Sequence, residues 1–265
     1  MFAIARHREL LDKLGLASLE QVKAYRGDLV KNHRGRRDIF RINVPEAAGH
    51  AHVLYLKRIL KPYRKDGLKS LLRQGRVESV SRREWENSRA LERAGIAVAG
   101  LIAYGEECGP LWEKFSFIIT ESAPGQTMEQ FLGACRDRAR RRDVFDALAR
   151  FVRQMHDAGL ATPDLFTRHI FVDTENGDPV FCLIDMARLD RRTRLPERLR
   201  ARDLAALNVT APLRLASTRE RLRFLHQYAG RRDRRLVQRI QRRVTRLLRR
   251  RKFQDFHRPP SRIPD

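Results

Sequence analysis

The stretch that decides the fold is Leu160-Ala161-Thr162-Pro163-Asp164-Leu165-Phe166-Thr167-Arg168-His169-Ile170-Phe171-Val172-Asp173. It carries a carboxylate at Asp164 and an imidazole five residues later at His169, and a second carboxylate, Asp185, ends the next apolar segment. Phosphoryl transfer uses an Asp to receive a hydroxyl proton, a metal-ligand position five residues on, and an Asp to hold magnesium after the following strand. The spacing therefore predicts a loop that catalyses phosphoryl transfer.

The segments around this loop predict how its two acids meet. An apolar stripe of helical period runs through residues 143–157 and ends at Gly159, so a core-facing helix leads into the loop. Strands are predicted at 170–172 and 180–184, with the turn-forming residues 176–179 between them. A hairpin of this kind brings Asp164 and Asp185 near one another.

The first half of the chain has strand patterning. Residues 28–33 and 38–44 flank a turn with one glycine, Gly35, and a second turn at 45–49 leads to a third strand at 52–59. Three antiparallel strands with a lysine, Lys57, on the third are typical of the small lobe of a kinase, where the hairpin covers the nucleotide phosphates. An ordinary surface hairpin is the alternative, because the tip has a single glycine.

A helix is predicted over 79–94, with Ser81 as its cap and Gly95 as its end. In a kinase this helix supplies a glutamate that pairs with the strand lysine. We choose Glu84 over Glu86 because the face of Glu84 also carries Leu91. The alternative is that Glu84 only completes the cap.

Two further strands, at 96–106 and 115–121, complete a five-stranded antiparallel sheet, and the turn-rich residues 122–125 separate it from a helical half. Helices are predicted there at 127–133 and 141–158. In a kinase this hinge offers backbone groups to adenine. Glu121 and Ala123 are the expected sources of the carbonyl and the amide.

Size and charge limit the partners of the chain. Its 265 residues carry a formal charge of +24, which attracts nucleic acid, an anionic membrane leaflet or a phosphorylated glycolipid. The three cysteines form no CxxC pair, and no apolar run is long enough for a membrane span or a signal peptide. We therefore expect a cytoplasmic protein that touches a membrane at its surface if at all.

Residues 231–252 carry twelve basic residues among regularly spaced apolar ones, which predicts an amphipathic basic helix. Such a helix suits an anionic leaflet or phosphorylated lipid A. Packing of its apolar stripe on the rest of the protein is an equally good explanation, and both can hold. No zinc spacing or aromatic recognition pattern points to nucleic acid.

Six stretches together carry a family likeness: residues 14–22, 83–87, 155–160, 164–172, 184–188 and 202–208. The combination resembles the lipopolysaccharide core kinases, the heptose and Kdo kinases whose fold is similar to that of protein kinases. The likeness covers roughly residues 14 to 230. It implies an α+β, two-lobed, protein-kinase-like fold with a reduced helical C-lobe. The expected parts are a helical preface (1–24), an N-lobe (25–121), a C-lobe with the catalytic loop (122–230) and a basic helix and tail (231–265).

The resemblance also implies a transferase that uses ATP and Mg²⁺ to phosphorylate a heptose or Kdo hydroxyl of the lipid A core at the inner face of the cytoplasmic membrane. By position, Asp164 would be the catalytic base and Asp185 the magnesium ligand, with Lys57 and Glu84 placing the phosphates. No obligate protein partner is implied.

Two positions depart from the protein-kinase pattern. His169 stands where protein kinases carry Asn, and because imidazole is a poor ligand for magnesium, it would bind through water or orient Asp185. Thr162 replaces the usual His, which leaves Asp164 without its usual preceding support. A catalytically silent kinase-like binding module and a basic nucleic-acid-binding protein are the alternative functions.

Overall fold

The structure is a computed structural model, and it describes residues 2–4, 7–44, 52–63, 75, 77–175, 177–250 and 253. The predicted turn at 45–49 and most of the basic connection at 61–67 lie outside these residues. The chain forms two compact units, one of Met1–Ala90 with Ala99–Ala123 and the other of Leu91–Val98 with Pro124–Asp265. The two-lobed α+β architecture is confirmed, while the predicted four-part division stays a prediction.

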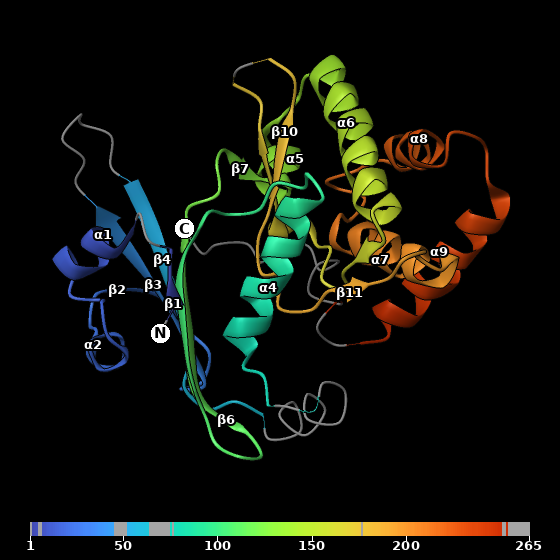
Figure 1. Cartoon of the computed structure of the whole chain (residues 1–265). Coiled ribbons are helices and arrows are strands. Elements are labelled where there is room, and N and C mark those ends of the chain that lie inside the picture. The colour runs from blue at the N-terminus through green and yellow to red at the C-terminus, as the bar shows by residue number, and fades with distance from the viewer. Residues whose placement is uncertain are drawn as a thin grey trace. The chain divides into compact units, whose positions relative to one another are not determined.

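The first unit is built on an antiparallel sheet with the strand order β1-β5-β6-β4-β3-β2 (Figure 1). Its strands are β1 (Phe2–Ala3), β2 (Asp28–Asn32), β3 (Arg37–Val44), β4 (His52–Ile59), β5 (Leu101–Cys108) and β6 (Glu113–Glu121). The last five are the predicted strands. The two-residue β1, which pairs Phe2 with Tyr104 of β5, was not foreseen.

The predicted fourth strand begins too early. Residues 96–98 belong to the second unit, where Ile96 is fully buried and the Leu183 amide donates to the Ala97 carbonyl at 3.0 Å. The backbone of this segment therefore bonds to β10 (Val180–Leu183) instead of to the sheet of the first unit, and β5 starts at Leu101.

The tip of the β2–β3 hairpin is a tight turn at Arg34 and Gly35, whose φ angles are 52° and 65°. The Arg36 amide donates to the His33 carbonyl at 2.9 Å, which closes a turn of the type that matches the twist of paired strands. Both central residues need positive φ, so the single glycine serves the turn itself.

Two short helices cover one face of this sheet: α1 (Arg8–Lys13) and α2 (Leu19–Ala24). Leu11, Leu16 and Val22 pack into one apolar cluster with sheet residues such as Leu54 and Phe117. Both helices lie within the expected helical preface, and Gly15, which has a positive φ of 65°, follows the end of α1.

The helix α4 (Val80–Arg93) follows. The hydroxyl of Ser79 accepts a hydrogen bond from the Arg82 amide at 3.0 Å and caps the helix. The predicted cap at Ser81 is wrong, because Ser81 lies inside the first turn and its hydroxyl bonds to that of Ser116 at 2.8 Å. Glu84 is therefore not part of a capping box.

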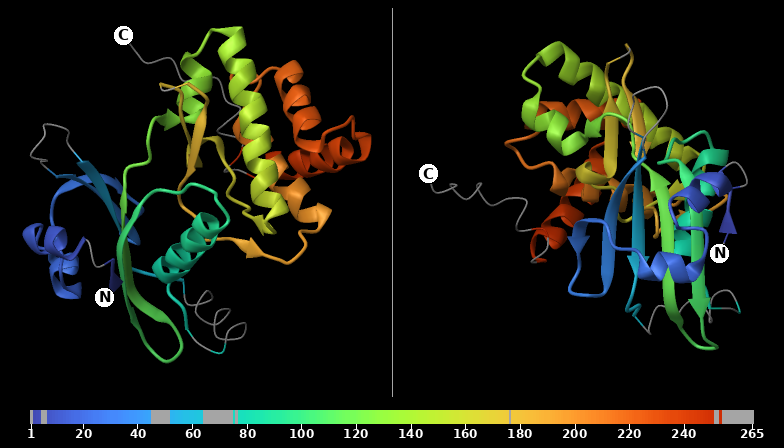
Figure 2. Two further views of the ribbon diagram at one scale, coloured as in Figure 1. Left: turned by 45° about the horizontal axis from the view of Figure 1, so that its top comes forward. Right: turned by 90° about the vertical axis from the view of Figure 1, so that its left-hand side faces the viewer.

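The second unit is mainly helical (Figures 1 and 2). Its helices are α5 (Met128–Ala134), α6 (Arg138–Asp157), η2 (Thr167–His169), α7 (Glu197–Thr210), α8 (Thr218–Ala229) and α9 (Arg234–Leu248). Helix α6 begins three residues before the predicted start because the Asp137 carboxylate caps it through the Ala139 and Arg140 amides. In both figures α6 runs beside α8, and α7 beside α9.

Two small sheets frame the catalytic loop within this unit. One has the order β10-β9-β7, from β7 (Gln126–Thr127), β9 (Ile170–Asp173) and β10 (Val180–Leu183). The other pairs β8 (Leu160–Ala161) with β11 (Asp190–Arg191). The predicted β9–β10 hairpin is confirmed, with Ile170 opposite Leu183.

Helix α9 contributes to the core of the second unit. Leu236 and Ile240 are buried in the same apolar cluster as Leu204 of α7 and Phe224 of α8, and Val244 packs against it. The predicted amphipathic helix is present, and its apolar stripe is covered by protein. No helix in the described part of the chain is both long enough and apolar enough to span a membrane.

Candidate active site

The first unit brings Lys57 and Glu84 together. Lys57 Nζ lies 2.7 Å from Glu84 Oε1 and 2.9 Å from Oε2, and both side chains are largely buried. Leu54 and Leu56 of β4 point into the cluster under α1 and α2, so strand alternation turns Lys57 to the opposite face. The contact expected from the sequence exists, while its role in binding phosphates stays a prediction.

The other residues predicted for this unit lie at its strand ends. Glu121 is the last residue of β6, and its amide donates to the Gly100 carbonyl at 2.7 Å. The next amide, of Ser122, donates to the Val53 carbonyl at 2.8 Å, and the buried Ala123 ends this part of the unit. Adenine binding by Glu121 and Ala123, and phosphate covering by Gly35, stay predictions.

In the second unit the backbone of Asp164 is fixed from both sides. Its amide donates to the Thr162 hydroxyl at 3.2 Å. Its carbonyl accepts from the Phe166 amide at 2.7 Å and contacts His169 Nδ1 at 3.0 Å. These bonds leave little freedom to the main chain that carries the Asp164 carboxylate.

The carboxylate of Asp164 is paired with Arg188, which was not predicted as a site residue. Arg188 Nε lies 2.5 Å from Asp164 Oδ2, and Arg188 Nη2 bonds to Oδ1, so the guanidinium holds both oxygens. The Arg188 side chain is 59% exposed and that of Asp164 only 15%. The sequence signal was present, since Arg188 is the third residue after Asp185.

Asp185 has a backbone conformation that is rare for a residue with a side chain. Its φ is 60°, in the left-handed region, where a non-glycine residue is disfavoured and is held by its surroundings. Here the preceding amide, of Ile184, donates to the His169 carbonyl at 3.0 Å. The Asp185 Oδ2 atom lies 3.9 Å from His169 Nε2, so the loop brings Asp164, His169 and Asp185 together as expected.

Burial lowers the pKa of His169, against the opposing pull of the Asp185 charge and of the hydrogen bond to Asp164, so the imidazole is neutral at pH 7. A carbonyl oxygen can only accept, which places the proton on Nδ1. Nε2 then carries a lone pair and accepts from Arg168 Nε at 3.4 Å. His169 thus orients the loop through Nδ1.

The donor set around Asp185 fits a magnesium ion held by one carboxylate. Magnesium prefers oxygen ligands, keeps several waters, and binds to one or two carboxylates with the rest supplied by phosphates. Within the described ranges no cluster of three or more His, Cys, Asp or Glu side chains could enclose a metal. The ion would therefore take its other oxygens from water and nucleotide.

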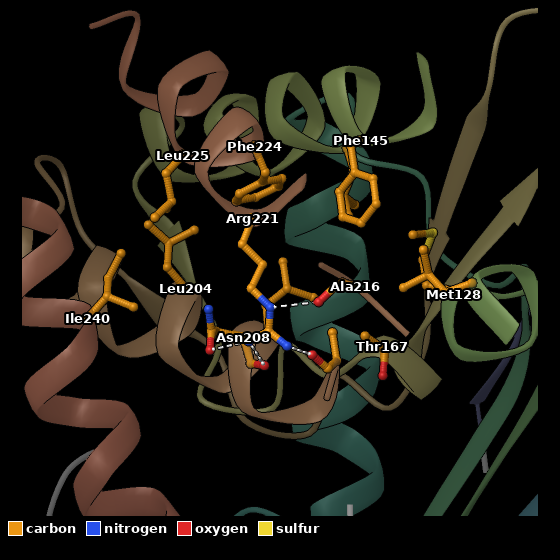
Figure 3. Close-up of a pocket in the computed structure, with 14 residues that line it drawn as sticks. Met128, Phe145, Thr167, Leu204, Asn208, Ala216, Arg221, Phe224, Leu225 and Ile240 are labelled. Carbon is orange, nitrogen blue, oxygen red and sulfur yellow. Dashed lines mark hydrogen bonds between the residues drawn. The ribbon is translucent and has the colours of Figure 1, made fainter. Parts of the chain in front are cut away.

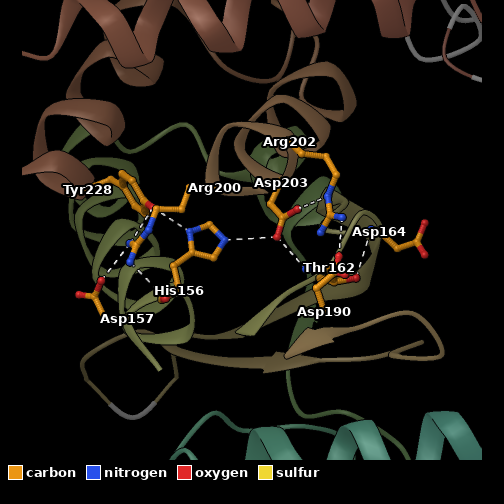
Figure 4. Close-up of polar contacts among 9 residues, drawn as sticks. All are labelled: His156, Asp157, Thr162, Asp164, Asp190, Arg200, Arg202, Asp203 and Tyr228. Atoms are coloured by element: carbon orange, nitrogen blue, oxygen red, sulfur yellow. Dashed lines mark hydrogen bonds and ion pairs between the residues drawn. The ribbon is translucent and has the colours of Figure 1, made fainter. Parts of the chain in front are cut away.

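The support of Asp164 comes from α7 (Figure 4). The Asp203 Oδ2 atom accepts from the Thr162 amide at 2.6 Å and lies 3.3 Å from His156 Nε2, while Oδ1 accepts from Arg202 Nε at 2.8 Å. The inference that Thr162 leaves the loop unsupported is therefore wrong, because a main-chain donor needs no particular side chain at position 162.

This support is deeply buried. His156 and Asp203 are fully buried, and His156 Nδ1 lies 2.7 Å from the Tyr228 hydroxyl on α8 (Figure 4). Burial of a carboxylate is costly unless several donors satisfy it, and Asp203 has them. His156 and Asp203 both lie in stretches of family likeness, but the contacts of His156 join it to residues 47 and 72 positions away in the sequence.

A pocket lies inside the second unit, with about 480 Å³ of empty space that includes its mouth (Figure 3). Its walls are mainly apolar and include Met128, Phe145, Leu204 and Phe224. Arg221 stands among them, bonded to the carbonyl of Ala216 at 3.0 Å and to other main-chain oxygens. No local sequence pattern marks this pocket, because its lining comes from six helices, α5, α6, η2, α7, α8 and α9, and from the segment between α7 and α8.

The fold and the loop together define a kinase-like phosphotransferase. Residues 20–228 match the model of the "Lipopolysaccharide kinase (Kdo/WaaP) family". The chain therefore belongs to the lipopolysaccharide kinase (Kdo/WaaP) family, and it is a kinase with a hydroxyl acceptor.

Among its relatives is the lipopolysaccharide core heptose(I) kinase WaaP of Pseudomonas aeruginosa, 31% identical over 223 residues, which cover 81% of each chain. The protein of the same name from Escherichia coli is 27% identical over 226 residues, covering 81% of this chain and 82% of that one. A solved structure, described as WaaP in complex with acyl carrier protein, is 28% identical with a TM-score of 0.66. That match covers 97% of this chain and 100% of the solved one.

Proposed function

We propose that this protein transfers the γ-phosphate of ATP to a hydroxyl of the first heptose of the lipopolysaccharide core, with Asp164 as the catalytic base. The observation that carries the proposal is the catalytic loop, in which Asp164, His169 and Asp185 are held together on a chain of this family. The choice of heptose over Kdo is supported by the curated relatives, which are named heptose(I) kinases.

Asp164 accepts the proton of the acceptor hydroxyl as its oxygen attacks the γ-phosphorus. Phosphoryl transfer depends mainly on positioning and on neutralising charge. The bonds that fix the Asp164 backbone provide the positioning. Asp203 secures the same loop through the Thr162 amide.

Asp185 holds the magnesium ion, which neutralises charge on the phosphates when it is bound. The strained backbone of Asp185 supports this role, because such conformations concentrate at functional sites. Lys57 contacts the nucleotide phosphates, and Glu84 keeps its ammonium group extended and charged. Gly35, Glu121 and Ala123 keep their proposed places around the nucleotide.

The acceptor implies work at the inner face of the cytoplasmic membrane. The charge of +24 supports attraction to an anionic leaflet. Because the apolar stripe of α9 is buried in the protein, this attraction would come from arginines and lysines rather than from insertion of the helix.

An acyl carrier protein is a second candidate partner, because a solved relative is described in complex with one. The apolar pocket of the second unit is the feature of this chain that suits an acyl group (Figure 3). Size-exclusion chromatography with acylated and unacylated carrier protein tests this. Equal binding of the two would show that the pocket does not bind the acyl group.

The central experiment incubates purified protein with labelled ATP, Mg²⁺ and a heptose-containing core acceptor. The Asp164→Asn variant should lose transfer while it keeps nucleotide binding. Asp178→Asn, at an exposed turn residue, is the matched control and should retain the wild-type rate. Nucleotide binding without transfer by the wild type would identify a silent kinase-like fold instead, and salt-sensitive binding of nucleic acid with no response to ATP would support the nucleic-acid alternative.

A further inference from the structure

The pairing of Arg188 with Asp164 conflicts with the role of Asp164 as a base. A guanidinium that bonds to both carboxylate oxygens occupies the positions from which the acid would accept a proton. An acceptor hydroxyl that reaches Asp164 must therefore find Arg188 displaced.

The side chain of Arg188 can move while the backbone on either side of it stays in place. The backbone before it is held by the Ile184 amide bond to the His169 carbonyl, and the backbone after it by the pairing of Asp190 with Ala161. The Arg202 guanidinium also holds the Asp190 carboxylate at 2.5 Å. Displacement is thus limited to the side chain of Arg188, which is 59% exposed, and exposed side chains change rotamer quickly.

Breaking the ion pair between Arg188 and Asp164 costs little free energy, but the Arg188 guanidinium then needs another anionic partner. An ion pair with one exposed member contributes little in water, so it can open readily. A bidentate guanidinium still prefers a planar carboxylate or a phosphate to solvent. A neutral sugar offers Arg188 neither of these.

We propose that Arg188 is an acceptor-binding residue that leaves Asp164 for an anionic group of the acceptor, a carboxylate or a phosphate close to the reacting hydroxyl. The base is then uncovered only when an acidic acceptor is in place. Water, which carries no such group, leaves Arg188 on Asp164, and ATP hydrolysis is suppressed. This inference rests on the proposed kinase function. It adds that the acceptor carries an anionic group near the reacting hydroxyl and that Arg188 binds this group.

The test compares wild type with Arg188→Ala on four acceptors: a core acceptor with its native anionic groups, the same acceptor after removal of phosphates, the same with its carboxylates reduced, and a neutral heptose glycoside. Loss of a charge-assisted bidentate contact should raise KM for the native acceptor at least about tenfold. The neutral glycoside, which cannot draw Arg188 away from Asp164, should be phosphorylated at least as fast by the variant as by the wild type. ATP hydrolysis without acceptor should rise in Arg188→Ala.

The two modified acceptors identify the anionic group, because removal of the one that Arg188 binds should raise the wild-type KM to that of the variant. Arg188→Lys keeps the positive charge but cannot bind an anion through two parallel hydrogen bonds, so its affinity for the native acceptor should lie between those of Arg188→Ala and wild type. Arg194→Ala, at another exposed arginine of the same segment, is the matched control and should behave as wild type. A thermal melt of each variant verifies folding.

Equal losses on charged and neutral acceptors would overturn the inference, and so would an unchanged KM for the native acceptor. A wild type that transfers phosphate to none of the four would overturn the proposed function as well. If the wild type is active and Arg188→Ala has the same preference for charged over neutral acceptors, only the role of Arg188 is overturned, and the proposed kinase function stands.

Discussion

The carboxylate of Asp203 accepts a hydrogen bond from the main-chain amide of Thr162 at 2.6 Å, and this bond ties the catalytic loop to α7. It acts two residues before Asp164, whose own amide bonds to the Thr162 hydroxyl. The position of the proposed base is therefore set from the buried interior of the second unit.

Replacement of Asp203 by Asn should lower kcat and leave nucleotide affinity nearly unchanged. The substitution removes the charge that Arg202 and the Thr162 amide share, and breaking a buried pair destabilises by about 3–5 kcal/mol. Steady-state kinetics and thermal unfolding measure the two effects. Asp190→Asn removes the other carboxylate on Arg202 and should spare kcat; an equal loss would show that Arg202, not Thr162, matters.

The exchange variant Lys57→Glu with Glu84→Lys should separate ion pairing from phosphate binding. Lys57→Met alone removes the ion pair with the buried Glu84 and should destabilise the protein by about 3–5 kcal/mol. The exchange should regain part of that stability but no transfer, since a glutamate in place of Lys57 repels phosphate. Melting temperature and transfer rate are the readouts, and transfer by the exchanged protein would count against phosphate binding by Lys57.

Stability should depend on pH through Glu113. Burial raises the pKa of Glu113, against hydrogen bonds from Ser116 and from the Val80 amide at the start of α4. The folded state thus keeps this proton to a higher pH than the unfolded state, whose pKa is near 4.5. The contribution is fully present below that value and is lost as pH rises through the folded pKa.

Glu113→Gln, which keeps an acceptor oxygen without a charge, should flatten this part of the profile. Urea denaturation of both proteins at pH values from 4 to 8 measures the difference in unfolding free energy. A difference that stays constant over this range would show that Glu113 does not titrate there.

Gly159→Ala should destabilise the second unit. Its φ is 77°, and a Cβ atom added there would lie 1.8 Å from the Arg192 carbonyl oxygen, a main-chain atom that cannot move aside as a flexible side chain can. The loss should exceed about 1 kcal/mol and disturb the β8–β11 pairing. Gly35→Ala has a similar φ but open space around it, so denaturation should show a smaller loss.

The sequence predicted those features that depend on local pattern. The alternation in β4 and the helical face of Glu84 sufficed to place Lys57 and Glu84 in contact. The spacing of Asp164, His169 and Asp185 sufficed for the loop, because a short hairpin returns the chain to the same place. In each case the prediction depends on residues that are close together in the sequence or on the periodicity of a single strand or helix.

The features that were missed depend on distant partners. Asp203 supports a loop 41 residues away, and nothing at position 203 in the sequence marks the Thr162 amide as its target. Ser79 and Ser81 are both acceptable caps by residue type, but the hydroxyl of Ser81 bonds to that of Ser116 on strand β6, and Ser79 caps the helix. The positive φ of Asp185 is likewise imposed by surroundings rather than by its residue type.

The burial of Leu236 and Ile240 has a consequence for biogenesis. The family match ends at residue 228, yet the core of the second unit includes side chains of α9 beyond it. On the ribosome, this unit cannot close its core until α9 has been synthesised, and Leu204 and Phe224 stay without part of their cover until then. A chain released before α9 would expose an apolar surface and become a target for chaperones and proteases.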